Sequence, residues 1–177
     1  MKMNNQQKGN NLMTINFEYE ATEQLNFDYE VLLKKVVEEC LDYEECPYES
    51  EVSILFTNDL DIQQINQEFR GIDAATDVLS FPSIEYETPG DFSMLEDSIV
   101  DCFHPETGEL LLGDIVISVD RAKLQAKEYD HTLEREIAFL TAHSMFHLMG
   151  YDHMEEDERI RMEEKQKDVL NKLQILR

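Results

Sequence analysis

Three histidines near the C-terminal end of the chain have the spacing of a metal site. His143 and His147 are four residues apart and His153 follows, which gives the pattern H-x3-H-x5-H. Helix side chains four residues apart lie on the same face, close enough to share one ion. Gly150 is the residue type that ends a helix in a left-handed conformation, so the chain can turn back and bring His153 to the same point. We therefore expect His143, His147 and His153 to bind one metal ion.

The donor set also indicates which ions fit. Three neutral imidazoles leave a fourth tetrahedral position for water or substrate, which distinguishes catalytic from structural zinc. We expect Zn²⁺, although Ni²⁺ or another transition metal also accepts imidazole ligands. The alternative interpretation is a polar network between core histidines. A third histidine placed after a glycine argues for the metal site instead. His104 and His131 lie outside the pattern, and we expect both to be exposed to solvent.

One residue type is absent from the motif. Zinc peptidases place a glutamate directly after the first histidine, in the order H-E-x-x-H, where it acts as the general base. Ser144 occupies that position here. Proteolysis of the usual kind would therefore lack its base, and a peptidase or other zinc hydrolase is kept only as an alternative function.

The helix that carries the first two histidines is expected to be buried. Residues 137–151 contain no Asp, Glu, Lys or Arg in a chain otherwise rich in charge. A helix without charge on any face is typical of a protein core. Thr132 is the expected N-cap of this helix, with acidic residues in the first turn.

The other elements predict an α+β fold. Alternating apolar residues indicate strands at 14–20, 52–56 and 77–81, and the apolar run at 111–119 indicates a central strand. Helices are expected after Asp28, after Asn58 with Ile62, Ile65 and Phe69 facing inward, from Asp120, and from about Glu155. We predict a small mixed β-sheet of about four strands packed with about five helices, the metal-site helix lying in the C-terminal half.

The chain has the length of a single domain. The first dozen residues are rich in Asn, Gln and Lys, so we expect residues 1–12 to form a disordered extension and residues 13–177 to form one domain. Residues 83–110 carry many acidic groups but no Lys or Arg, which is typical of a long mobile loop.

Charge and composition limit the partners. Fifteen Lys and Arg against 39 Asp and Glu leave a net charge of −24. Long-range repulsion of polyanions argues against tight nonspecific binding of DNA or RNA, but a local cation can still hold an RNA substrate. No apolar run approaches the roughly 20 residues that a membrane helix needs. Three cysteines, without a C-x-x-C pair, suit a reducing cytoplasm.

Three segments in order resemble one known family. HSMFHLMGYDH at residues 143–153 resembles the signature of the YbeY family, bacterial rRNA maturation factors regarded as metal-dependent single-strand endoribonucleases. NQEFRGIDAATDVLSFP at 66–82 and LGDIVIS at 112–118 resemble two further blocks of that family. Two departures are small, because Ser144 stands where the family usually has Gly and Ala75 stands where Pro is common.

The resemblance implies a function and a further site residue. It implies a three-histidine zinc site in a cleft with Arg70 opposite, and catalytic roles for Arg70 and His143, although Arg70 alone reads as an ordinary cation at a helix end. It also implies late processing of the small-subunit rRNA 3′ end and ribosome quality control. The implied partners are rRNA, the pre-ribosomal small subunit, and ribosomal or GTPase assembly proteins. A non-catalytic assembly factor with a structural metal is the remaining alternative.

Overall fold

The computed structural model describes residues 13–96 and 101–176, and the expected disordered extension at 1–12 lies outside these ranges. Within them, a four-stranded mixed sheet has the order β1-β2-β4-β3. Its strands are β1 (Met13–Tyr19), β2 (Ser50–Thr57), β3 (Val78–Pro82) and β4 (Leu110–Ser118). β1, β2 and β4 are parallel, and β3 runs antiparallel to β4 at the edge. The predicted α+β class and small mixed sheet are confirmed.

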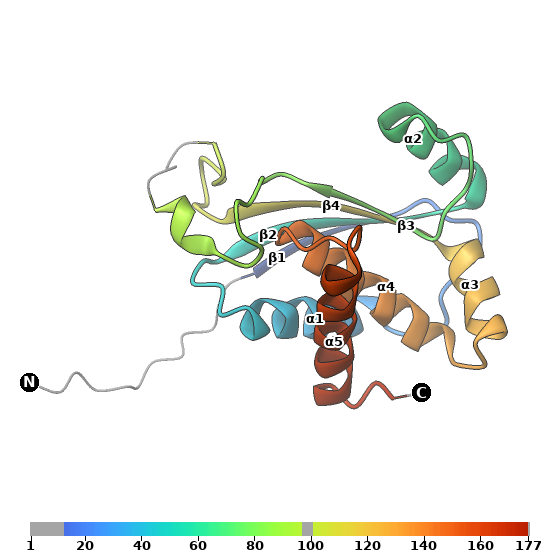
Figure 1. Cartoon of the computed structure of the whole chain (residues 1–177). Helices are drawn as coiled ribbons and strands as arrows, with labels where there is room; N and C mark the ends of the chain where they lie inside the picture. The colour runs from blue at the N-terminus through green and yellow to red at the C-terminus, as the bar shows by residue number, and fades with distance from the viewer. Residues whose placement is uncertain (1–12, 97–100, 177) are drawn as a thin grey trace, which may run out of the picture.

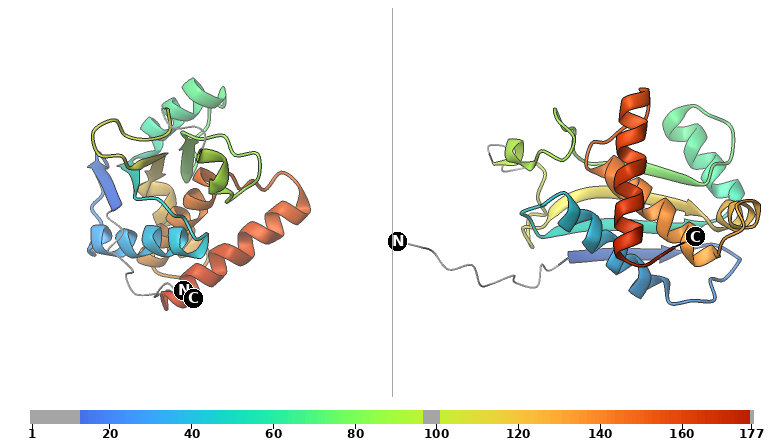
Figure 2. Two further views of the ribbon diagram at one scale, coloured as in Figure 1. Left: turned by 90° about the vertical axis from the view of Figure 1, so that its left-hand side faces the viewer. Right: turned by 60° about the horizontal axis from the view of Figure 1, so that its bottom comes forward.

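Five α-helices surround the sheet in the described ranges. They are α1 (Tyr29–Tyr43), α2 (Asp59–Arg70), α3 (Val119–Glu128), α4 (Leu133–Leu148) and α5 (Glu156–Lys172). α1 and α4 cover one face of the sheet, and α2 lies on the opposite side (Figure 1). α5 packs against α1 and α4 and crosses in front of α4 (Figure 2). None of the described helices combines the length and apolar character needed to cross a bilayer.

Side-chain caps set the beginnings of these helices. The predicted caps Asp28, Asn58 and Thr132 each accept a hydrogen bond from the backbone amide three residues on, at 3.0–3.1 Å. The expected start of α3 at Asp120 is wrong by one residue, because Ser118 is its cap. Asp120 instead accepts from the backbone amide of Asp59, at 3.0 Å, and so connects α3 to the start of α2.

The uncharged stretch of α4 forms the centre of the core. Ile137, Ala138, Ala142, Met145 and Phe146 are fully buried between the sheet and the flanking helices. This burial confirms the inference drawn from the absence of charge. It also holds the backbone of the two helical histidines against a rigid support.

Two segments near the surface were the subject of expectations. Phe69 was expected to face inward, but 65 % of its side chain is exposed, because α2 packs on the sheet mainly through Ile62. The mobility expected of the acidic loop stays a prediction, and the part of the loop at residues 83–96 packs on the core. Phe92 and Leu95 are buried in a short 3₁₀ turn, and the Gly90 amide donates to the Met149 carbonyl at 2.9 Å.

Candidate metal centre

The three predicted histidines converge on one point. The Nε2 atoms of His143 and His147, one turn apart on α4, lie 3.1 Å from each other. One ligand atom from each of His143, His147 and His153 lies within 4.8 Å of the others. Zn–N bonds of 2.0–2.1 Å in a tetrahedral arrangement place ligand nitrogens about 3.3 Å apart. The three side chains therefore fit a single ion.

The turn after α4 brings in the third histidine and orients the second. Gly150 has φ +92°, a conformation that favours glycine, and it reverses the chain toward the cleft. The Tyr151 carbonyl then lies 2.8 Å from Nδ1 of His147. Because a carbonyl only accepts, Nδ1 carries the proton and Nε2 of His147 is free to bind an ion.

Burial keeps the helical histidines neutral. It lowers the pKa of His143 to about 4, with His147 and His153 acting in the same direction. The pKa of His147 is also lowered, mainly by burial and only partly opposed by its bond to the Tyr151 carbonyl. Metal binding requires neutral imidazole, so both rings have the charge state that ligation needs at neutral pH.

The histidines open into a cleft of about 1150 Å³ whose walls come from α2, β3, α4 and α5. Arg70, the last residue of α2, lines this cleft, and its charge helps to lower the pKa of His147. Gly71, with φ +70°, ends α2 at that point. Arg159 also lines the cleft, but it is paired with Glu156 and Glu163 at 2.6 Å.

Two histidines outside the motif are less exposed than expected. His131 was expected at the surface, but its side chain is only 4 % exposed and Nε2 lies 2.9 Å from a Glu136 oxygen. His104 is half-buried, and its Nδ1 accepts from the backbone amides of Glu106 and Thr107. Both take part in local structure. Burial, together with the nearby Asp77 charge, raises the pKa of Glu136 to about 7.

The residue that replaces the peptidase glutamate points into the core. Ser144 is fully buried, and its hydroxyl is 2.9 Å from that of Ser80 on β3. It therefore ties α4 to the edge strand and supplies no general base. Asp152, the neighbour of His153, accepts from the His153 backbone amide at 2.7 Å.

Sequence reasoning missed one contact of the site. Gln166 on α5 is 3 % exposed and places Nε2 3.0 Å from Nδ1 of His143. The available signal was a polar residue in the apolar stripe of α5, between Met162 and Val169. A buried amide in such a stripe needs a partner, which could have directed attention to it.

Comparisons with known proteins identify the family. The family model described as "Endoribonuclease YbeY" matches residues 14–174. Proteins of that name from Lachnoclostridium phytofermentans and Lachnospira eligens are each 54 % identical, over 93 % of this chain and all of theirs. The solution structure of TM1509 from Thermotoga maritima superposes with a TM-score of 0.53 at 21 % identity, covering 92 % of both chains, which supports the fold.

These matches and the three converging histidines define the class of the protein, which is a metal-dependent endoribonuclease. The chain belongs to the YbeY endoribonuclease family.

Proposed function

We propose that residues 13–177 form one domain that cleaves single-stranded RNA with a zinc ion held by His143, His147 and His153. We further propose that it acts in the cytoplasm, in late processing of the small-subunit rRNA 3′ end and in ribosome quality control. The observation that carries the proposal is the convergence of three imidazoles in an open cleft that also contains Arg70. Family membership supports RNA as the substrate class.

The proposed roles follow from the chemistry of each group. When bound, zinc would polarise a phosphate oxygen and lower the pKa of a coordinated water toward 7. His143 and His147 place their Nε2 atoms 3.1 Å apart on one helix face, and together with His153 they would hold the ion. Arg70 supplies a planar set of donors, suited to charge that develops on phosphate oxygens during cleavage.

The zinc and RNA parts of the proposal are tested together. Purified protein should contain one zinc per chain by elemental analysis and should cleave single-stranded RNA in preference to a duplex. His143→Ala should lose both zinc and cleavage, because it removes a ligand. Full zinc occupancy in this variant, or cleavage that is unaffected by the loss of zinc, would contradict the assignment.

Arg70 is tested by separating chemistry from metal binding. Arg70→Ala should keep the zinc content and lower kcat by about 10²–10³, the effect of removing one donor to developing charge. Arg70→Lys should recover only part of the rate, because an ammonium lacks the planar fork. The matched control is Arg121→Ala, since Arg121 lies on α3, paired with Asp59, and is not part of the cleft wall. Unchanged turnover in Arg70→Ala would reject the role.

The proposed partners follow from charge. With a net charge of −24 the chain is repelled by bare RNA at long range, so a pre-ribosomal small subunit or an assembly protein is proposed to present the substrate. Mapping of small-subunit rRNA 3′ ends in cells that carry only the Arg70→Ala variant tests whether the chain acts on the pre-ribosomal particle by catalysis. Unprocessed ends support catalysis, whereas normal ends would favour a non-catalytic assembly role with a structural metal.

A further inference from the structure

Gln166 lies at a position that the proposed chemistry does not yet use. It is buried on the face of α5 that packs on α4, in the wall between the metal cleft and a second cavity of about 550 Å³. Its Nε2 is 3.0 Å from Nδ1 of His143. Its Oε1 is buried and has no hydrogen-bond partner among the described residues.

The amide of Gln166 can face His143 in two orientations, and each requires a different form of the ring. When Nε2 of Gln166 faces the ring, the amide donates a hydrogen bond and Nδ1 of His143 must be unprotonated. The proton of the neutral imidazole then resides on Nε2 of His143. A half-turn of the amide exchanges the two atoms and places Oε1 against the ring. Oε1 then accepts from a protonated Nδ1, and the orphaned oxygen gains a partner.

Only the second arrangement leaves Nε2 of His143 free for an ion. Nε2 is the atom that faces His147, 3.1 Å away, so it is the atom placed to bind metal. A ligating imidazole normally donates its other N–H to an acceptor that fixes its orientation. His147 has the Tyr151 carbonyl for this purpose, and the Gln166 amide occupies the same place for His143.

We propose that Gln166 is the positioning residue of His143. Its Oε1 accepts a hydrogen bond from the protonated Nδ1 when the ion is bound and so holds the ring in its ligating form. This inference rests on the proposed zinc site and adds to it a contact from α5, outside the histidine motif.

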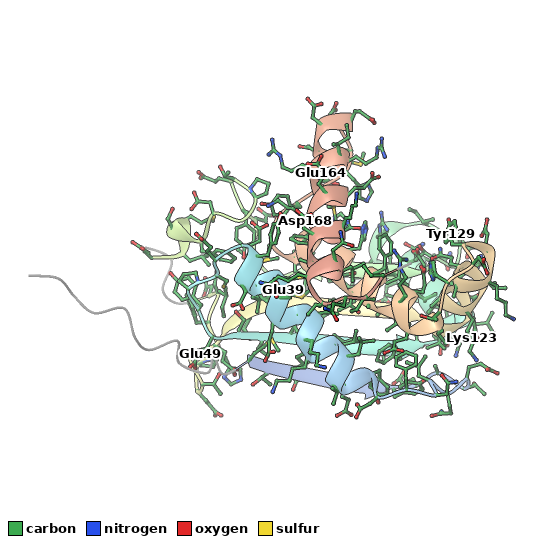
Figure 3. All side chains as sticks on the ribbon, turned by 90° about the horizontal axis from the view of Figure 1, so that it is seen from below. Glu39, Glu49, Lys123, Tyr129, Glu164 and Asp168 are labelled. Carbon is green, nitrogen blue, oxygen red and sulfur yellow. The ribbon has the colours of Figure 1, made fainter. Side chains whose placement is uncertain are left out.

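The surroundings of α5 hold the amide in place. Met162, Val169 and Leu170 of α5 are buried on either side of Gln166 along the helix. Polar contacts fasten the same helix to α1, since Lys172 pairs with Glu39 at 2.6 Å and Tyr43 donates to Asp168 at 3.0 Å. Glu39 and Asp168 mark these two neighbouring helices in Figure 3. The amide is therefore presented from a fixed helix rather than from a loop.

The test measures zinc affinity by competition with a chromophoric chelator. Gln166→Leu keeps the approximate size but removes the acceptor, and should weaken zinc binding about 10- to 100-fold, as expected for loss of an outer hydrogen-bond partner. Gln166→Glu restores an acceptor and should bind zinc at least as tightly as the natural protein. Val169→Ala is the matched control, because it loosens the same helix without touching His143, and it should change zinc affinity less than threefold.

A spectroscopic readout separates positioning from packing. In the zinc-loaded protein, the ring ¹⁵N spectrum of His143 should show a protonated Nδ1 whose proton exchanges slowly with solvent. Gln166→Leu should speed that exchange at least tenfold, whereas Val169→Ala should not. Zinc affinity in Gln166→Leu equal to that of the natural protein, or an unchanged exchange rate, would overturn the inference and leave the proposed function standing. Failure of the natural protein to bind zinc would overturn both.

Discussion

Substitution of Gly150 by alanine should impair both the fold and the metal site. Gly150 has φ +92°, and a Cβ built there would lie 2.8 Å from Cβ of Tyr86 and 3.0 Å from two of its ring carbons. The new methyl group therefore meets two separate costs. One is the backbone conformation, and the other is contact with a half-buried residue of the loop that packs beneath the turn.

The two costs can be assigned magnitudes. A left-handed backbone costs an L-residue roughly 1–2 kcal/mol, and overpacking a filled site typically costs another 1–3 kcal/mol. Gly150→Ala should therefore lower the free energy of unfolding by about 2–5 kcal/mol. Any relief must move either Tyr86 or the turn itself. Movement of the turn displaces the Tyr151 carbonyl and His153, so zinc affinity should fall by about tenfold or more.

Gly108 offers a matched control. It has φ +75°, but a Cβ there would meet no heavy atom within 4 Å. Gly108→Ala should cost only the backbone part, about 1–2 kcal/mol, and should leave zinc affinity unchanged. Urea unfolding and zinc competition on both variants provide the measurements. Equal destabilisation by the two substitutions, or natural zinc affinity in Gly150→Ala, would refute the reasoning.

Three further predictions concern pH and metal removal. Burial raises the pKa of Glu136 to about 7, so the stability it contributes is complete below pH 4.5 and is lost as pH rises through about 7. The free energy of unfolding of Glu136→Gln, measured in urea relative to the natural protein, should therefore rise by up to about 3 kcal/mol between pH 5 and pH 8.5. A difference that does not change with pH would contradict this. When zinc is present at about 100 times its Kd, its removal by a chelator should lower the free energy of unfolding by about 2.7 kcal/mol and the Tm by roughly 5–11 °C. An unchanged Tm would argue against a bound ion. Because burial lowers the pKa of His143 and keeps that ring neutral well below pH 6.5, its ring ¹⁵N signals in the metal-free protein should remain those of a neutral imidazole at pH 6, where a charged ring would count against the burial argument.

The features predicted correctly from sequence are those that depend on nearby residues. The helix that carries His143 and His147 follows from 15 residues without charge, and the cap at Thr132 follows from residue type. Gly150 indicated the turn, because the conformation it adopts is set within one or two residues. A side-chain spacing of four residues on a helix fixes proximity without any knowledge of the rest of the fold.

The features missed or predicted wrongly depend on contacts between distant segments. Phe69 has the spacing of a buried residue, but it meets the sheet edge-on at Phe81 of the edge strand β3 and stays 65 % exposed. His131 reads as exposed next to a helix start, yet Glu136 one turn into α4 closes over it. Gln166 is 23 residues from His143, and only the docking of α5 on α4 brings them together. Periodicity identifies a face of a helix but does not say what that face meets.

The distribution of charge in the cleft limits how RNA can be held there. Among the described residues of the cleft wall, the cations are Arg70 and Arg159, and the carboxylates are Asp77, Glu85, Asp152 and Glu163. Arg159 is neutralised by its pairs with Glu156 and Glu163, whereas Arg70 forms no ion pair within the described ranges.

Attraction for a phosphate is therefore concentrated at Arg70 and at the proposed ion. The other three carboxylates of the wall, Asp77, Glu85 and Asp152, and the net charge of −24 oppose the approach of the rest of the strand. Most of the binding energy for RNA in such a cleft would come from the one phosphate that reaches the histidines, and little would come from the RNA backbone on either side. Because binding to RNA releases counterions in proportion to the phosphates neutralised, we expect this cleft to bind free RNA weakly, in keeping with the proposed delivery by a partner.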